Sequence, residues 1–245
     1  MKVCLMEMDL AWANPGKNVA EAERVVASSE PADLYILPEM WSTGFSVEPE
    51  SVAEDEDKSL ALKWMKTTSL EHNCALSGSL AVRVAEDGSY RNRHYFVTPD
   101  SVVFYDKHHL FTHGGEDAHY TAGSEPVIAP WQGVRFLLQT CYDLRFPVFS
   151  RWGRAGEYDA IIYVANWPAS RQLAWDTLVR ARAIENQCYV AAVNRIGHDP
   201  FTSYEGGSCL IEPTGKEVDE LNMERLHKMR SHFRVLADRD SQSII

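Results

Sequence analysis

The sequence predicts a single α/β domain, and three observations support this prediction. The chain has 245 residues, which is enough for one α/β domain with a sizeable core. Short apolar runs of strand length alternate with amphipathic segments of helical length in both halves. No linker divides the halves, and the sequence contains neither internal repeats nor low-complexity segments. We therefore expect strands and helices to pack into one sandwich.

The first half is expected to contain two helices and a hairpin. Asn14 and Pro15 begin a helix whose apolar residues recur at three- and four-residue spacing. A second helix is expected around Leu60, after an acidic loop that we interpret as solvated surface. Asp87-Gly88 is a strong signal for a hairpin turn. The strands expected in this half are residues 2–10, 33–39, 74–84, 93–98 and 101–105.

The second half is expected to hold another hairpin, two helices and a charged tail. The hairpin turns near Trp131-Gln-Gly133, and its second strand ends at Cys141. Phe149 and Trp152 stand three residues apart, which predicts a helix over residues 148–154. From residue 220 onward the chain is charged and is predicted to be irregular. The hairpin covers residues 126–138, a long helix is expected over residues 171–186, and strands are expected over residues 159–166, 188–194 and 208–211.

Charge and cysteine content exclude several classes of protein. The net charge of −11 disfavours binding to nucleic acid or to an anionic membrane. The five cysteines are scattered and form no C-x-x-C pair, which argues against a disulfide framework and a structural zinc site. Glu7 and Asp9 interrupt the segment that a signal peptide would keep apolar, and no run of 18 apolar residues could span a membrane. A cytoplasmic protein is expected.

Cys141 is a candidate nucleophile because of its place in the predicted fold. It ends a buried strand and precedes a turn, so we expect the turn to expose its sulfur and a following helix N-terminus to favour the thiolate. The alternative is that Cys141 is a small buried hydrophobe, as free cysteines usually are.

Two other strands also end at residues suited to catalysis. Glu39 follows a buried strand and could serve as a base with a raised pKa, while Lys107 could stabilise an oxyanion. The backbone N–H of Tyr142, next to the cysteine, would be a second oxyanion donor. Taken singly, Glu39 could be a surface residue at a strand end and Lys107 a solvated loop charge.

Three motifs around these residues resemble the nitrilase superfamily. They are Leu37-Pro-Glu39-Met-Trp-Ser-Thr-Gly-Phe45, Tyr105-Asp-Lys107-His-His-Leu-Phe111 and Gln139-Thr-Cys141-Tyr-Asp-Leu-Arg-Phe-Pro147. The family's Glu-Lys-Cys triad corresponds to Glu39, Lys107 and Cys141, in the family's order. Glu116 fits the family's second glutamate, which supports the lysine. The resemblance extends from the first strand to about Gly215.

The resemblance implies a fold, an assembly and a reaction. The fold would be a four-layer-forming α-β-β-α sandwich, with a carbon–nitrogen hydrolase domain over residues 1–219 and a tail over residues 220–245 at a subunit interface. The protein would pair across a helical face into a homodimer or a higher homo-oligomer. It would hydrolyse a carbon–nitrogen bond through a cysteine thioester, with no cofactor and no metal.

Within the superfamily the motifs look most like bacterial omega-amidases. Those enzymes open the terminal amide of 2-oxoglutaramate or 2-oxosuccinamate, giving the 2-oxo diacid and ammonia. Such an anionic substrate needs a cation, and Arg171 is the candidate for pairing with its distal carboxylate. Trp41, Phe45 and Trp167 are expected to wall the pocket, although large aromatics are more often core. Arg145 is expected to pair with Asp143.

Other functions remain open at this point. A nitrilase, an aliphatic amidase or an N-carbamoyl amidohydrolase would use the same chemistry on another small substrate. A non-catalytic binding module is disfavoured because all three triad residues are present. A zinc hydrolase would need ligands, and the spacing of the clustered histidines matches no ligand motif. These are His108, His109, His113 and His119.

Overall fold

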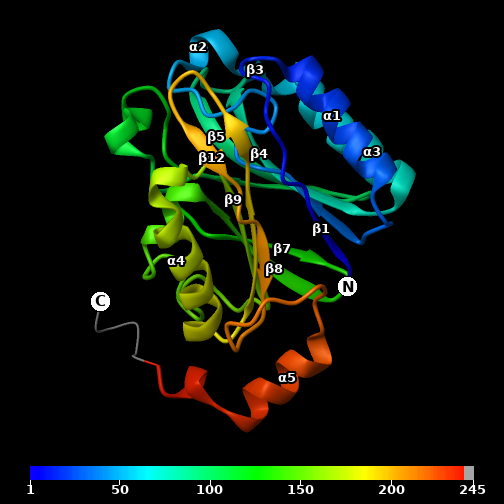
Figure 1. Cartoon of the computed structure of the whole chain (residues 1–245), viewed down its shortest axis with the longest axis vertical. Helices are drawn as coiled ribbons and strands as arrows, with labels where there is room; N and C mark the ends of the chain where they lie inside the picture. Colours follow the sequence, from blue (N-terminus) through cyan, green and yellow to red (C-terminus); the bar gives the residue numbers. More distant parts are fainter. Residues whose placement is uncertain (240–245) are drawn as a thin grey trace.

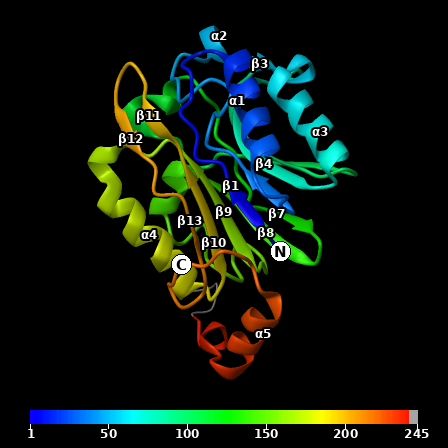
Figure 2. The ribbon, with the colours of Figure 1, turned by 45° about the vertical axis from the view of Figure 1, so that its right-hand side comes forward.

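A computed structural model describes residues 1–239 and places two mixed β-sheets face to face, with helices on both outer sides (Figure 1). Helices α1 (Pro15–Ser28) and α3 (Leu60–His72) cover the first sheet. Helix α4 (Gln172–Glu185) covers the second sheet on the opposite side of the molecule. The turned view in Figure 2 separates the same layers. The predicted α-β-β-α sandwich is confirmed.

The first sheet is built from the N-terminal half. Its strand order is β1-β2-β4-β5-β6, with β3 paired to β4. The first three strands of this order run parallel, and the pairs β4–β5 and β5–β6 are antiparallel. The strands are β1 (Val3–Leu5), β2 (Leu34–Ile36), β3 (Glu54–Asp55), β4 (Ala75–Arg83), β5 (Tyr90–Val97) and β6 (Val102–Asp106).

The second sheet is built from the C-terminal half. Its strand order is β13-β10-β9-β8-β7, and β8, β9 and β10 run parallel. A separate hairpin, β11 with β12, was not predicted from the sequence. The strands are β7 (Val127–Trp131), β8 (Val134–Thr140), β9 (Ala160–Ala165), β10 (Tyr189–Asn194), β11 (Ile196–His198), β12 (Ser203–Glu205) and β13 (Cys209–Ile211).

Central strand β9 shows why the apolar runs are continuous rather than alternating. Ala160, Ile162 and Val164 face the core between the two sheets, while the residues between them face the layer under α4. Every residue of β9 is therefore buried. A strand that is covered on both faces needs apolar side chains at every position.

Two helices begin at residues whose side chains cap them. Asn14 Oδ1 accepts a hydrogen bond from Lys17 N at 3.1 Å, and Pro15 occupies the first turn of α1. Ser59 caps α3 by accepting from Leu62 N at 3.0 Å. The acidic loop before α3 is not simply solvated surface, because it contains the short helix α2 (Pro49–Val52) and strand β3.

Two predicted segments differ in the structure. Residues 148–154 form turns rather than a helix, and the chain instead enters the short 3₁₀ helix η4 (Cys141–Arg145) directly at the cysteine. Phe149 lies against the ring of His108, with centroids 4.3 Å apart, so its spacing from Trp152 reflects packing on a turn.

The tail is not irregular, contrary to the prediction. It forms helix α5 (Met223–His232) and a short 3₁₀ helix, η6 (Val235–Ala237). Arg230 binds it to the second sheet, because its guanidinium donates to Tyr158 O at 2.9 Å and pairs with Asp159 at 3.2 Å. The part of the predicted tail from Asp240 to Ile245 lies outside the described residues.

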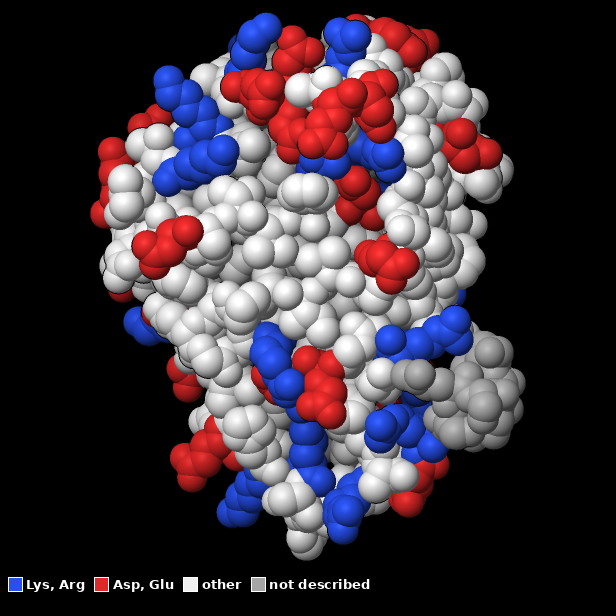
Figure 3. Space-filling model, turned by 180° about the vertical axis from the view of Figure 1, so that it is seen from behind, with Lys and Arg blue, Asp and Glu red and all other residues white. Residues whose placement is uncertain are grey.

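The surface charge is unevenly distributed. On the face seen in Figure 3, acidic and basic side chains gather toward the two ends, while the broad middle is largely uncharged. Within residues 1–239, no helix is both long enough and apolar enough to cross a lipid bilayer.

Candidate active site

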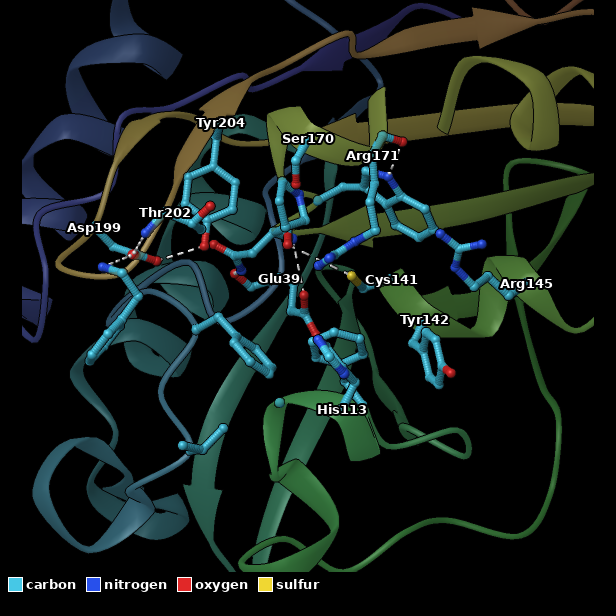
Figure 4. Close-up of a pocket in the computed structure, with 18 of the residues that line it drawn as sticks. Glu39, His113, Cys141, Tyr142, Arg145, Ser170, Arg171, Asp199, Thr202 and Tyr204 are labelled. Carbon is cyan, nitrogen blue, oxygen red and sulfur yellow. Dashed lines mark hydrogen bonds between the residues drawn. The ribbon is translucent and has the colours of Figure 1, made fainter. Parts of the chain in front are cut away.

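The ends of strands from both sheets meet at one pocket (Figure 4). Lys107 directly follows β6, and Glu39 follows β2 by way of Leu37 and Pro38. Cys141 directly follows β8, and Asn166 directly follows β9. Residues far apart in the chain are therefore brought together by the face-to-face packing of the two sheets.

Lys107 lies between two carboxylates in a site closed to solvent. Its Nζ is 2.8 Å from Glu39 Oε1 and 2.8 Å from Glu116 Oε2, and all three side chains are 0% exposed. Burial alone would favour a neutral lysine, but the carboxylates of Glu116 and Glu39 outweigh it and raise the pKa of Lys107. Lys107 is therefore a fixed positive charge.

Glu116 comes from the long loop that follows Phe111. It sits in the 3₁₀ helix η3 (Glu116–Ala118), and its Oε2 also accepts a hydrogen bond from Phe111 N at 2.7 Å. Burial raises the pKa of Glu116, and Lys107 opposes that rise. The loop is longer than a connection requires because it delivers this second carboxylate to the lysine.

Glu39 is held on both of its oxygens. Oε1 accepts from Lys107 Nζ and from Asn92 Nδ2, each at 2.8 Å. Oε2 accepts from Asn166 N at 3.0 Å. These contacts hold the carboxylate in one orientation beside the cysteine, as a proton-transfer group requires.

The backbone of Cys141 is held in an unusual conformation. Its φ angle is +45°, a left-handed conformation that is unfavourable for a side chain with a Cβ. Its Sγ lies 4.0 Å from Asn166 O. Burial and the nearby Glu39 carboxylate raise the pKa of Cys141 well above its usual value, and Lys107 only partly opposes them. This shift favours the protonated thiol over the thiolate that a following helix N-terminus was expected to favour, and a thiol nucleophile needs a base.

The pocket above these residues has a volume of about 440 Å³. Glu39, Lys107 and Cys141 all reach it. Phe45 and Trp167 line it, as expected for aromatic walls, and so does Tyr142. Trp41 does not: it is 0% exposed and packs against Trp64 in the core beneath the first sheet, at a centroid distance of 5.3 Å. The substrate contact expected of Trp41 is therefore wrong.

Two guanidinium groups line one side of the pocket. Arg171 lies 5.3 Å from the ring centroid of Phe111, and Arg145 lies 5.0 Å from that of Trp167. Arg145 does not pair with Asp143, contrary to expectation. Asp143 is instead buried and accepts hydrogen bonds from Tyr105 and His109.

The opposite side of the pocket is built by the β11–β12 hairpin. Tyr204 donates a hydrogen bond to Asp199 Oδ2 at 2.6 Å, and Asp199 Oδ1 accepts from the backbone N of Phe201 and Thr202. Figure 4 shows Asp199, Thr202 and Tyr204 on one side of Glu39 and Cys141, with Arg145 on the other. The pocket is therefore polar at both ends.

Two of the four clustered histidines, His108 and His109, have structural contacts, while His113 lines the pocket. His109 Nδ1 lies 2.8 Å from Asp143 Oδ1, and His108 Nδ1 lies 2.7 Å from Gly123 O. Their rings stack on Phe146 and Phe149. Among residues 1–239, no group of three His, Cys, Asp or Glu side chains could hold a metal ion.

Sequence reasoning missed Asn92 and the residues of the β11–β12 hairpin. Asn92 is 1% exposed and contacts both Glu39 and Glu116. One signal was available: the run Arg91-Asn-Arg-His94 places four polar residues in an otherwise buried strand. Buried polar side chains need partners, so such a run marks a polar site inside the fold.

The chain is similar to known proteins over nearly its full length. The family model described as carbon-nitrogen hydrolase matches residues 2–226. The omega-amidase YafV of Escherichia coli (strain K12) is 40% identical, over 98% of this chain and 97% of that protein. The 2-oxoglutaramate amidase of Bacillus subtilis (strain 168) is 34% identical, over 89% and 85%. The crystal structure of XC1258 from Xanthomonas campestris, a CN-hydrolase superfamily protein, matches with a TM-score of 0.91 and 37% identity, over 98% of this chain and 97% of that one.

Proposed function

Because this chain belongs to the carbon–nitrogen hydrolase family of the nitrilase superfamily, we propose that it is an omega-amidase acting on 2-oxoglutaramate or 2-oxosuccinamate. The products are the 2-oxo diacid and ammonia. The relatives named omega-amidase and 2-oxoglutaramate amidase support this choice within the family.

One observation on the site supports the substrate class most directly: Arg171 and Arg145 line the pocket that also exposes Cys141. A guanidinium pairs with a carboxylate through two parallel hydrogen bonds, so it fixes both the position and the orientation of an anionic substrate. The protein has a net charge of −11, so a small anionic substrate needs such a local cationic region. The carboxylate would bind there while the terminal amide reaches Cys141.

Acylation begins from the protonated thiol. Glu39 takes the proton from Cys141 as the sulfur attacks the amide carbon, and it returns that proton to the nitrogen of the leaving group. The carbon–nitrogen bond breaks, ammonia leaves, and a thioester to Cys141 remains. A base is needed because burial and Glu39 keep the pKa of the resting thiol high.

Lys107 is suited to stabilise the oxyanion of each tetrahedral intermediate. An ammonium group has three donors, and Glu39 and Glu116 occupy two of them. The third is available to the pocket, which Lys107 lines. The backbone N–H of Tyr142 would supply a second donor. In deacylation, Glu39 would activate a water that attacks the thioester and restores the thiol.

We also propose that the protein is a homodimer paired across α4. Leu173 is 81% exposed and Ile184 is 51% exposed. Eleven residues separate them, which is about three turns, so they lie on one face of the helix. Exposed leucine and isoleucine on one stripe suit a protein–protein contact.

The decisive assay is ammonia release from 2-oxoglutaramate by the wild-type enzyme and by Cys141→Ala. The proposal expects release by the wild type and a loss of at least about 10³-fold in the variant. If the wild type releases no ammonia from 2-oxoglutaramate but hydrolyses propionamide, a nitrile or an N-carbamoyl compound, the omega-amidase assignment is wrong. Release that persists in Cys141→Ala would contradict the nucleophile.

A further inference from the structure

The side-chain amide of Asn92 joins the two carboxylates of the site. Asn92 lies on β5 and is 1% exposed. Its Nδ2 donates to Glu39 Oε1 at 2.8 Å and to Glu116 Oε1 at 2.9 Å. An amide nitrogen has two hydrogens, so both are used, one for each carboxylate.

The amide can adopt only one orientation here. Turned by 180°, it would place its own oxygen against two carboxylates, and like partial charges in a buried site repel strongly. In the observed orientation its Oδ1 is buried and has no hydrogen-bond partner among the described atoms. Leaving an acceptor unpaired is unfavourable, which shows that the two contacts through Nδ2 decide the orientation.

Asn92 also makes the two oxygens of Glu39 different. Oε1 accepts from Lys107 and Asn92, which fills both of its lone-pair directions. Oε2 accepts from Asn166 N and from no other N–H group of residues 1–239, so one direction remains open to a proton from Cys141. A proton arriving at Glu39 therefore has one place to bind.

We propose that Asn92 is a positioning residue that directs proton transfer to Oε2 of Glu39. This inference rests on the proposed amide hydrolysis. In the first step the S–H bond of Cys141 breaks, an O–H bond forms at Oε2, and the sulfur electron pair forms the bond to the amide carbon while the carbonyl π pair moves to the oxygen. The same proton then moves from Oε2 to the leaving nitrogen as the oxyanion re-forms the C=O bond and the carbon–nitrogen bond breaks, and Glu39 is a carboxylate again.

The charges around Asn92 explain why a neutral donor is needed there. The buried cluster holds two carboxylates and one ammonium, so one negative charge has no full counter-charge. The Asn92 hydrogen bond lowers the pKa of Glu116, against the rise caused by burial. Loss of this donor would raise the pKa of Glu116 further, so the cluster would bind a proton at a higher pH.

The test compares Asn92→Ala and the isosteric Asn92→Asp with Ser77→Ala. Ser77→Ala is the matched control, because it removes one buried side-chain hydrogen bond to β5, the 2.7 Å contact between Ser77 on β4 and His94, without touching either carboxylate. For Asn92→Ala we expect kcat to fall about 10- to 100-fold, as for a lost hydrogen bond to a charged group, with KM changed less than about 3-fold. The acidic limb of the kcat/KM profile should move to higher pH.

Asn92→Asp adds a distinctive signature. An aspartate of the same shape repels both carboxylates when ionised and donates to only one of them when protonated. Its activity relative to the wild type should therefore rise as the pH falls from 8 to 6. The control should keep the wild-type kcat and profile.

The inference fails if Asn92→Ala retains kcat within about 2-fold of the wild type. It also fails if both Asn92 variants lose activity by the same factor at every pH, so that their pH profiles keep the wild-type shape. That result would mean a purely structural role. If Asn92→Ala does not fold, the pH signature of Asn92→Asp alone decides. Ratios are measured on 2-oxoglutaramate or, if the wild type rejects it, on propionamide, so a wrong substrate does not affect this test.

Discussion

Asn166 binds Glu39 with both its main chain and its side chain, although 127 residues separate them. Its backbone N–H donates to Oε2 of Glu39 at 3.0 Å, and its side-chain amide donates to the main-chain carbonyl of Glu39. Glu39 follows a strand of the first sheet and Asn166 a strand of the second. The orientation of the proposed base is therefore set by the packing of the two sheets against each other.

Replacing Glu39 should separate thiol reactivity from catalysis. Burial and Glu39 both raise the pKa of Cys141, so Glu39→Gln removes a negative charge and should lower the pKa of the thiol. We expect amide hydrolysis to fall by at least about 10³-fold while Cys141 reacts faster with iodoacetamide, about tenfold for each unit by which its pKa falls. Peptide mapping after timed alkylation at pH 7 to 9 measures this.

The wild-type thiol supplies the reference for that experiment. Because its pKa lies well above the usual value, its alkylation rate should still be rising at pH 9. Cys74, Cys188 and Cys209 are buried and serve as internal controls. Equal alkylation of Cys141 in both proteins would contradict the electrostatic effect of Glu39.

The two pocket arginines should determine selectivity for an anionic substrate. For Arg171→Ala we expect KM for 2-oxoglutaramate to rise about 10- to 100-fold, since a charged hydrogen-bond partner is lost, with little change for propionamide. Arg145→Ala should act in the same direction. Arg154→Ala is the control, because Arg154 is exposed and does not line the pocket. An equal loss on both substrates would indicate damage to the site instead.

Lys107→Met should destabilise the fold in a pH-dependent way. The change leaves Glu39 and Glu116 buried without their counter-charge, which typically lowers the free energy of unfolding by about 3–5 kcal/mol. The folded-state pKa of Glu116 is already raised by burial, and losing Lys107 raises it further. A carboxyl with a raised pKa binds a proton more readily in the folded state, so its contribution to stability grows as the pH falls.

Urea unfolding at pH 7.5 and pH 5.5 measures this effect. The stability deficit of Lys107→Met should be smaller at pH 5.5, where a proton replaces part of the missing charge. The control is Lys66→Met on α3, an exposed lysine whose loss should change stability by less than about 0.5 kcal/mol. A deficit that grows toward pH 5.5 would have the wrong sign.

Substitution on α4 should reveal the proposed dimer. Leu173→Glu places a charge on the exposed apolar stripe and should shift the protein from dimer to monomer in light scattering after size-exclusion chromatography. Leu70→Glu is the matched control, because Leu70 is 68% exposed but lies on α3, on the other side of the sandwich. The proposed interface is wrong if the wild type is a monomer, or if Leu173→Glu remains a dimer as Leu70→Glu does.

Local patterns predicted most of the fold. The strand periods, the Asp87-Gly88 turn and the helix start at Asn14-Pro15 depend on residues near in sequence, and the structure has a strand, a hairpin or a helix at each. The failures have long-range causes. Phe149 and Trp152 have helical spacing, but Phe149 is held on a turn by its contact with His108. Arg230 similarly ties the tail to Asp159 of the second sheet.

By itself the sequence predicted one α/β sandwich, because apolar runs and helical spacings are local properties. Its three strand-end motifs identified Glu39, Lys107 and Cys141, and the α-β-β-α architecture was implied by their resemblance to the nitrilase superfamily. Only the tertiary structure decided the environment of these residues. In the tertiary structure Asn92 lies between two carboxylates, Trp41 is buried in the core, and Arg145 lines the pocket. The physical reason is that hydrogen bonds, burial and the resulting pKa shifts depend on neighbours supplied by distant strands, and no spacing along the chain encodes which strands will meet.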